Sequence, residues 1–498
     1  MSRCITKVVV VGGGTAGWMS AALIRRVLGT QVAVELVESE AIGIVGVGEA
    51  TIPPIQVLNS VLGIPEGEFL RETRASIKLA IRFEGWRVPG ESYFHTFGTP
   101  GQNHAFCDFQ HFWRRGQQLG RAQGLWDYDL NYLCCERGLF GRPRTQDPFL
   151  DVPYAYHFDS GLYGQYLRKI SQANGVTRTE GLISQVLLDP ESGHVRTLRL
   201  QDGREVHGDL FVDCSGMRGL LIQQQLDVGY EDWSHWLPCD RALAVPSERL
   251  AHTLPYTRSI AHRAGWQWQI PLQHRIGNGL VYSSRHISDD EAVATLLGNL
   301  PGPALAEPRV IPFRTGRVRE QWARNVCAVG LSSGFLEPLE STSIYLIQSA
   351  IVRLLKLFPH QGITPALVDE YNAQSRLEYE TIRDFIILHY HVNERTDSAF
   401  WHEVRHMSVP QRLRDKINLF RASGRLFQDP YDLFKDASWL QVLLGQGVMP
   451  QDHHPIAEAF APDELAQVLA GMAAGKRKGL EGMMPHDDYL AAAMRAPA

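Results

Sequence analysis

The stretch that most constrains the fold is KVVVVGGGTAGWMSAALIRRVL, residues 7–28. An apolar run suited to a buried strand leads directly into G-x-G-x-x-G and then into a helical pattern. Gly12 permits the turn, Gly14 lets a pyrophosphate approach the backbone, and Gly17 lets helix and strand pack closely. The start of the helix offers free N–H groups and the positive end of its dipole to phosphate. The segment therefore predicts a dinucleotide site that contains Gly12, Gly14, Thr15, Ala16 and Gly17.

A candidate ribose-binding acid follows at the expected distance. Residues 31–39, QVAVELVES, are typical of a second strand, and Glu38 stands 21 residues after Gly17. A carboxylate at this position receives the ribose hydroxyls in dinucleotide folds. The alternative is a tight turn that binds no ligand, but strand, helix and acid together favour the nucleotide. The sequence thus predicts a parallel βαβ unit.

Two further segments bear on the choice between FAD and NAD, which the fingerprint alone leaves open. GVGEATIPP, Gly46 to Pro54, is a second glycine turn suited to a larger cofactor. GDLFVDCSG, Gly208 to Gly216, resembles the strand by which flavoprotein monooxygenases return to the nucleotide domain. A strand that returns this late means that the nucleotide domain is interrupted by an insertion. The layout resembles the Rossmann-type FAD-binding fold of the para-hydroxybenzoate hydroxylase type.

The chain changes character towards its C-terminus. Residues 195–207 predict a hairpin around an Asp-Gly turn, residues 240–315 are strand-rich, and residues from about 345 have apolar spacing typical of helices. We therefore predict an α/β fold with α+β insertions. Residues 1–345 would form an FAD-binding domain with an inserted substrate-side sheet and loops, and residues 346–498 a mainly helical substrate-binding part. The last twenty residues are expected to be loosely ordered.

Composition excludes several classes of function. A net charge of -5 over 498 residues gives no broad basic field, so nucleic acid is not an expected partner. The seven cysteines include no C-x-x-C pair, so neither a zinc ribbon nor a bound metal is expected, and the pattern fits a reducing cytoplasm. No secretory signal and no apolar run of about 20 residues is present, so we expect a cytoplasmic protein without membrane spans.

The segment GWQWQIPL, Gly265 to Leu272, carries a more specific signal. In a strand, Trp266 and Trp268 would share one face with the isoleucine that follows, and the intervening glutamines would take the other face. W-x-W-x-I-P is the hallmark of flavin-dependent halogenases. Other segments resemble that family in order along the chain, namely GVGEAT, SIKLAIRFEGW, FHTFG, DLFVDCSGMRGLLI, FLEPLESTSIYLI and SWLQVLLGQG. From residue 8 to about 450, the chain resembles the tryptophan-halogenase-like group.

The resemblance implies a reaction and a catalytic lysine. In that family reduced FAD and oxygen convert halide to hypohalous acid, which passes through a tunnel to a lysine beside an aromatic substrate. Lys78, in SIKLAIRF, matches that lysine. Its ammonium can hydrogen-bond the oxygen of hypohalous acid, and its neutral amine can become an N-haloamine. A partly buried lysine shifts its pKa readily; the alternative is a surface lysine on a strand edge.

The segment EPLESTS supplies the other residues implied in chemistry. By resemblance Glu340 stabilises the cationic ring intermediate and helps remove its proton; the alternative is an acid that caps the following helix. The amides of Thr342 and Ser343 would hold the halide near the flavin. Many tryptophan halogenases have glycine where Ser343 stands, which leaves chloride and bromide both open as halide.

The resemblance also assigns residues to the substrate and the cofactor. His95 and Phe97 would line the aromatic pocket, with Phe434 as a further candidate, and core packing is the alternative for all three. Trp266 and Trp268 would lie beside the tunnel and keep the organic substrate away from the flavin. The further FAD-binding residues that the resemblance implies are Ala50, Val186, Leu331 and Ile344.

Partners follow from the same resemblance. The chain has no second G-x-G-x-x-G in a βαβ setting, so reduced FAD is expected from a separate flavin reductase, and family members often form homodimers. Substrates left open are tryptophan, indole, another indole derivative or a phenolic ring. An FAD-dependent aromatic monooxygenase on the same scaffold is the main alternative, and a non-catalytic FAD-binding protein is a third.

Overall fold

The structure is a computed structural model that describes residues 4–42, 48–104, 106–143 and 147–495. Gly46 and Val47, which open the second glycine segment, lie outside the described residues. Within the described part of the chain, no helix is both long enough and apolar enough to cross a membrane.

The nucleotide half is built on a six-stranded sheet. Five neighbouring strands run parallel, and β21 is antiparallel at one edge. In spatial order the strands are β21 (Trp322–Ala323), β22 (Val326–Ala328), β13 (Leu210–Asp213), β1 (Lys7–Val11), β2 (Ala33–Glu38) and β9 (Thr177–Glu180). The valines of β1 are buried because both faces of this parallel sheet are covered. The predicted βαβ unit and the late return of β13 beside β1 are therefore confirmed.

Two layers cover this sheet. On one face α1 (Thr15–Leu28) packs between α6 (Ser160–Ala173) and α8 (Ser343–Lys356), with Trp18, Ile347 and Leu36 in one core. On the other face a three-stranded sheet packs against the odd-numbered valines of β1. That sheet consists of β10 (Ile183–Leu188), β11 (Val195–Leu200) and β12 (Glu205–His207), which includes the predicted hairpin.

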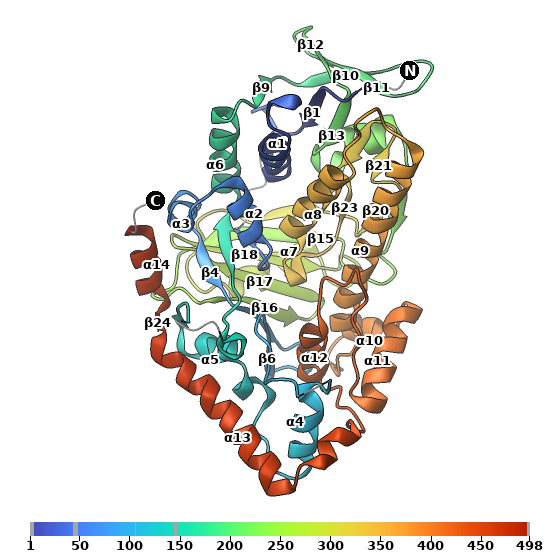
Figure 1. Cartoon of the computed structure of the whole chain (residues 1–498). Coiled ribbons are helices and arrows are strands. Elements are labelled where there is room, and N and C mark those ends of the chain that lie inside the picture. The colour runs from blue at the N-terminus through green and yellow to red at the C-terminus, as the bar shows by residue number, and fades with distance from the viewer. Residues whose placement is uncertain (1–3, 43–47, 105, 144–146, 496–498) are drawn as a thin grey trace.

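The middle of the molecule holds a seven-stranded sheet (Figure 1). All its neighbours are antiparallel except β16 and β5, which are parallel. Its order is β19 (Arg309–Pro312), β15 (Arg241–Ser247), β18 (Ile276–Tyr282), β17 (Gly265–Pro271), β16 (Tyr256–His262), β5 (Ala80–Glu84) and β6 (Ser92–Thr96). The W-x-W-x-I-P segment is thus an interior strand, and every residue of β17 is buried.

A small three-stranded sheet packs against the seven-stranded one. Its strands are β3 (Gly48–Ala50), β8 (Ala155–Asp159) and β4 (Ser76–Lys78), with β4 at one edge. β3 also lies against β17 and β18. The remaining pairings are β14 (Tyr230–Asp232) with β20 (Gly316–Val318) and β23 (Gly334–Phe335), and β7 (Leu139–Phe140) with β24 (Met484–Pro485).

Helices dominate the C-terminal third, as predicted. The long amphipathic segment forms α9 (Pro365–His391), followed by α10 (Ala399–His406), α11 (Gln411–Ser423), α12 (Asp436–Gly445) and α13 (Pro462–Lys478). The N-terminal part contributes α2 (Ile55–Leu62), α3 (Glu66–Glu72), α4 (Phe109–Gln118), α5 (Leu130–Arg137) and α7 (Asp289–Gly298). In Figure 1 the chain of α13 runs along the lower edge of the molecule and returns upward to α14 (His486–Arg495).

The expectation of a loosely ordered C-terminus is wrong for the described residues. α14 packs against α3, and His486 and Leu490 are buried. The segment has few large apolar residues, so its composition resembles that of a loose tail. Its order comes from contacts with residues far away in the sequence.

Candidate active site

Lys78 lies at the end of β4 and its side chain is fully buried. Its Nζ atom donates hydrogen bonds to the backbone oxygen of Thr51 at 3.0 Å and to the Oγ atom of Ser341 at 2.8 Å. The same atom lies 5.2 Å from the ring centroid of Phe97. The alternative of a surface lysine on a strand edge is therefore wrong. The lysine is held where three chain segments meet.

Burial changes the acid–base behaviour of this amine. Removal from water lowers the pKa of Lys78 to about 7, although the charge of Glu340 raises it. Both the ammonium and the neutral amine are then accessible near pH 7. An exposed lysine would be almost fully protonated under the same conditions.

The segment that meets Lys78 changes backbone conformation at each step. A 3₁₀ turn, Pro338–Glu340, ends at Ser341, whose φ of 59° and ψ of 39° are left-handed. Thr342 returns to right-handed values, φ -90° and ψ -9°, and α8 begins at Ser343. Successive left- and right-handed residues point their amides into one concavity, which suits an anion. No side chain of the described residues caps the start of α8.

Glu340 is held between two imidazole rings. The Nδ1 atom of His95 lies 2.9 Å from its Oε2 atom, and the Nε2 atom of His389 lies 2.8 Å from its Oε1 atom. Burial alone would raise the pKa of Glu340, but the two histidines outweigh it and lower the pKa to about 2. The side chain is therefore a buried carboxylate that faces histidines rather than the amides of α8, so the helix-capping alternative is wrong.

Aromatic side chains surround this carboxylate. The ring of Phe434 stacks on Phe385 at 4.0 Å and lies 6.2 Å from the ring of His95. Trp439 meets Phe385 edge-on at 5.0 Å. The structure therefore brings the three predicted pocket residues together, with His95 on Glu340, Phe434 beside His95, and Phe97 over Lys78.

The glycine turn fits a dinucleotide. Gly12 has a φ of 114°, and a Cβ atom there would lie 2.3 Å from the carbonyl oxygen of Cys214. A Cβ atom on Gly17 would lie 1.9 Å from the carbonyl oxygen of Gly12, so helix and strand touch as predicted. A Cβ atom on Gly14 would meet none of the described atoms within 4 Å, and no described side chain caps α1 there. The turn thus leaves open space in front of uncapped amides, which suits a pyrophosphate.

Most of the other predicted cofactor residues lie on elements that border this turn. Glu38 ends β2, its Oε2 atom lies against Gly13, and its Oε1 atom pairs with Arg178. Thr15 and Ala16 form the first turn of α1. Leu331 follows Gly330, and a Cβ atom placed on Gly330 would lie 2.9 Å from the Cβ atom of Ala16.

Three predicted cofactor residues lie further from the glycine turn along the fold. Ala50 precedes Thr51, and Ile344 lies in the first turn of α8, so both flank the segments that meet at Lys78. Val186 lies in β10, half-buried in the small outer sheet.

The two tryptophans lie on one face of β17, as predicted, and are called the tryptophan wall below. The rings of Trp266 and Trp268 are 6.0 Å apart on one face of β17. On the other face Gln267 and Gln269 both donate to the backbone oxygen of Asn299. The geometric prediction of opposite faces is therefore confirmed. Both faces of β17 are therefore covered, because Asn299, directly after α7, lies on the glutamine face.

Several residues of this region escaped the sequence analysis. They are Ser341, His389 and Glu337. The Oε2 atom of Glu337 accepts hydrogen bonds from Trp266 Nε1 at 2.9 Å and from Tyr390 Oη at 2.6 Å. Burial raises the pKa of Glu337 to about 7. Ser341 and Glu337 lie within the EPLESTS segment, so the resemblance of that segment could have indicated both residues. His389 carries no sequence signal of its own, because a histidine inside a long amphipathic helix is ordinary.

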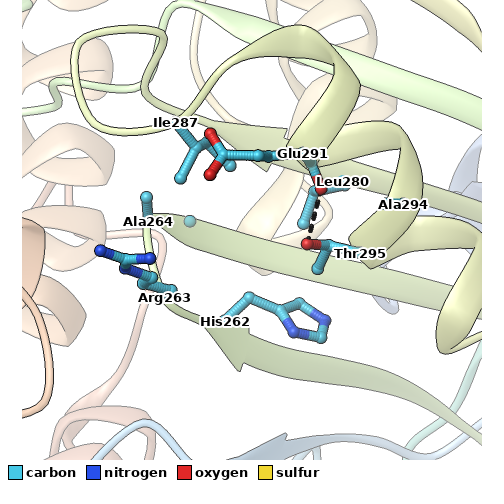
Figure 2. Close-up of a pocket in the computed structure, with 9 residues that line it drawn as sticks. His262, Arg263, Ala264, Leu280, Ile287, Glu291, Ala294 and Thr295 are labelled. Atoms are coloured by element: carbon cyan, nitrogen blue, oxygen red, sulfur yellow. Dashed lines mark hydrogen bonds between the residues drawn. The ribbon is translucent and has the colours of Figure 1, made fainter.

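A pocket of about 220 Å³ lies elsewhere, between the β16–β17 turn and α7 (Figure 2). His262, Arg263 and Glu291 are among its lining residues, and none of the residues predicted for chemistry lines it. Lys78 is near the opposite end of β16, since the next residue, Leu79, bonds the oxygen of Pro255. This pocket is therefore separate from the lysine site. Among the residues that the structure describes, no group of three or more His, Cys, Asp or Glu could hold a metal ion.

Comparisons with known proteins agree with this architecture. The family model described as tryptophan halogenase matches residues 7–462. Tryptophan 6-halogenase ThaL of Streptomyces albogriseolus is 35% identical, and the match covers 96% of each chain.

Two solved structures are more similar still. Xcc4156, a flavin-dependent halogenase from Xanthomonas campestris, is 46% identical with a TM-score of 0.97 over 100% of both chains. BrvH, a flavin-dependent halogenase from Brevundimonas sp. BAL3, is 46% identical with a TM-score of 0.95 over 98% of this chain and 99% of its own. Sequence and fold agree over the whole length, and the protein therefore belongs to the tryptophan halogenase family and is a flavin-dependent halogenase.

Proposed function

We propose that this enzyme uses reduced FAD, oxygen and chloride or bromide to halogenate an electron-rich aromatic ring, with Lys78 and Glu340 as its catalytic residues. The observation that carries the proposal is the contact between Lys78 and Ser341. A fully buried amine thus bonds the turn whose amides would hold the halide, and it is near enough to Glu340 for that charge to affect its pKa. A buried amine next to a buried carboxylate is costly to fold, and such an arrangement is typical of a functional site.

The FAD site lies in the nucleotide half of the protein. Gly12, Gly14 and Gly17 would hold the pyrophosphate, and Glu38 the ribose. When bound and reduced, FAD supplies with oxygen the oxidising power that converts halide to hypohalous acid. The amides of Thr342 and Ser343 would hold the halide in the left-right turn described above. Because Ser343 keeps a side chain at the start of this helix, chloride and bromide both belong in the assay.

Lys78 is the acceptor for hypohalous acid in this proposal. Two of its N–H groups are used on Thr51 and Ser341, which fixes the direction of the third. As an ammonium, Lys78 would donate that third hydrogen to the oxygen of hypohalous acid, so that the halogen faces the substrate. The substrate ring then attacks the halogen, the O–halogen bond breaks, and the oxygen leaves as water after protonation.

Glu340 would act on the ring after the halogen arrives. The ring carries a positive charge at this stage, and a carboxylate fixed by His95 and His389 stabilises that charge without having to reorient. The ring proton then leaves to the carboxylate or to the imidazoles that contact it. Since the pKa of Glu340 is about 2, the carboxylate is available at every pH where the protein is expected to work.

The proposed substrate class rests on the aromatic side chains near Lys78 and Glu340 and on relatives. His95, Phe97 and Phe434 offer flat faces for an aromatic ring. ThaL is a tryptophan 6-halogenase and RebH of Lentzea aerocolonigenes is a tryptophan 7-halogenase. We therefore propose an indole ring as substrate, whether as tryptophan, as indole or as another indole derivative. A separate flavin reductase would supply the reduced FAD.

The alternative of an aromatic monooxygenase, left open by the sequence, does not fit a member of the halogenase family. The tryptophan wall argues against it, because Trp266 and Trp268 fill one face of β17 with fully packed rings that would separate organic substrate from flavin. Direct oxygen transfer requires contact between the two.

The test is a turnover assay with the full chain, FAD, a flavin reductase, NADH, oxygen and either chloride or bromide. Products from a panel of tryptophan, indole, indole derivatives and phenols are identified by mass spectrometry. We expect a halogenated indole, and none with Lys78→Ala, which should still bind FAD. Oxygenated products that form without halide would instead identify a monooxygenase, and the absence of any halogenated product from holo enzyme would refute the proposal.

A further inference from the structure

The strand that presents Lys78 is an edge strand. β4 pairs with β8 on one side only, with Ile77 opposite Tyr156. Edge strands leave alternate N–H groups without a strand partner, and such groups need another acceptor when they are buried. The residues on either side of Lys78, Ile77 and Leu79, are two positions apart, so their N–H groups point to the same side.

Two acceptors receive the N–H groups on this outer side of β4. The N–H of Leu79 donates to the backbone oxygen of Pro255 at 2.8 Å. The N–H of Ile77 donates to the Nε2 atom of His486 at 3.1 Å. Lys78 thus stands between two anchored amides, one held by a neighbouring loop and the other by a side chain of the C-terminal helix, 409 residues away from Ile77.

The hydrogen bonds of His486 define its protonation. Its Nδ1 atom lies 2.8 Å from the backbone oxygen of Thr253, and a carbonyl oxygen only accepts, so Nδ1 carries the hydrogen. Nε2 is then left with a lone pair for the N–H of Ile77. Burial lowers the pKa of His486 to about 4, which keeps the ring neutral near pH 7. Both ring nitrogens are therefore hydrogen-bonded, Nδ1 as the donor and Nε2 as the acceptor.

The C-terminal segment is fixed in this position by contacts of its own. β24 pairs with β7, and the N–H of His486 donates to the oxygen of Gly138 at 3.0 Å. Further along α14, the hydroxyl of Tyr489 donates to Glu66 at 3.1 Å. The match to the family model ends at residue 462, so this segment lies beyond the matched part of the chain.

We propose that His486 is a positioning residue for Lys78: its imidazole fixes the outer edge of β4 and thereby holds the lysine amine against Thr51 and Ser341. This inference rests on the catalytic role proposed for Lys78. The C-terminal helix then serves the reaction through the strand that carries Lys78. A shift of about 1 Å in a catalytic group can cost about 100-fold in rate, so loss of this anchor should be visible in turnover.

The test compares three full-length variants. His486→Leu keeps a side chain of similar size but removes both hydrogen bonds of the ring. His486→Gln keeps one acceptor and one donor. Tyr489→Phe is the matched control, because it removes the hydrogen bond from α14 to Glu66 and leaves His486 in place. Halogenation of the indole substrate that the turnover assay identifies gives kcat and KM. FAD affinity is measured separately, and hydrogen exchange by mass spectrometry reports on the amide of Ile77.

We expect His486→Leu to lower kcat about tenfold or more, with KM and FAD affinity within about twofold of wild type, and to accelerate exchange at Ile77. His486→Gln should recover most of the rate, and Tyr489→Phe should resemble wild type. Wild-type kcat or unchanged exchange in His486→Leu would overturn the inference, as would an equal loss in Tyr489→Phe, which would indicate general loosening of α14.

The Lys78→Ala variant distinguishes a failure of the proposed function from a failure of this inference. Turnover by Lys78→Ala would remove the lysine from the mechanism and this inference with it. An inactive Lys78→Ala variant together with a fully active His486→Leu variant would overturn only the positioning role of His486.

Discussion

The Nζ atom of Lys78 lies 2.8 Å from the Oγ atom of Ser341, a residue whose backbone is left-handed. The contact joins two segments 263 residues apart. Left-handed backbone is uncommon for residues other than glycine, and it costs about 1 kcal/mol when a β-carbon is present. Ser341 therefore combines an unfavourable backbone with a hydroxyl that fixes the lysine, and the two effects can be separated by mutation.

Ser341→Gly should lower kcat about tenfold because it removes one hydrogen bond from Lys78 while the backbone conformation becomes easier to adopt. Ser341→Ala should lower kcat similarly but be about 1 kcal/mol less stable than Ser341→Gly, since alanine retains the strain. Steady-state halogenation and urea unfolding measure the two quantities. If both variants turn over like wild type, the hydroxyl has no part in placing the amine.

The rate of halogenation should fall as pH rises through about 7. Burial brings the pKa of Lys78 to about 7, and the proposed mechanism needs the ammonium form to donate to hypohalous acid. Single-turnover rates with FAD reduced beforehand avoid the pH dependence of the reductase. A rate that rises through the same interval would assign the reactive role to the neutral amine, as an N-haloamine.

The burial of Lys78 should also be visible in stability. Its pKa is about 7 in the folded protein and 10.5 in the unfolded chain, so the unfolded chain binds the proton more tightly between these values. The cost of burial is fully present below pH 7 and is relieved as pH rises towards 10.5, with a maximum of about 5 kcal/mol. Relative to Lys78→Met, wild type should therefore gain free energy of unfolding as pH rises from 7 to 10. Parallel pH curves for the two proteins would contradict the lowered pKa.

Glu340→Gln should lower kcat by about 100-fold and leave FAD binding unchanged, because it removes the charge that stabilises the cationic ring. Glu337→Gln is the matched control three residues upstream. Glu337 is equally buried, but its pKa is raised to about 7, and a glutamine oxygen can accept from Trp266 and Tyr390 as the carboxyl does. Comparable losses in the two variants would show that the segment tolerates no substitution and that the charge of Glu340 is not the cause.

Trp266→Phe should keep the fold but raise the share of oxygenated product or hydrogen peroxide, since a smaller ring opens the wall and leaves Glu337 with one donor fewer. Trp266→Ala should in addition lower the free energy of unfolding by about 3–5 kcal/mol, because the ring is fully buried. Peroxide yield and product ratio are measured together with urea unfolding. Unchanged coupling in a stable Trp266→Phe variant would reduce the motif to core packing.

Local sequence patterns determined much of this protein. The strand and glycines of residues 7–28, the acid at Glu38, the tryptophan face of β17 and the long helix α9 all follow from spacing along the chain, because each depends on neighbours within a few residues. The same patterns located Lys78 and Glu340 through their resemblance to a family.

Tertiary structure alone decided what those two residues touch. Lys78 is buried because β4, the turn at Ser341 and the carbonyl of Thr51 converge on it, and Glu340 is ionised because His95 and His389 face it from separate elements. The order of the C-terminus was missed for the same reason: α14 has a weak local pattern and is held by contacts such as that of His486 with Ile77. Periodicity records which face of an element is apolar, whereas packing and register fix which distant side chain lies against it.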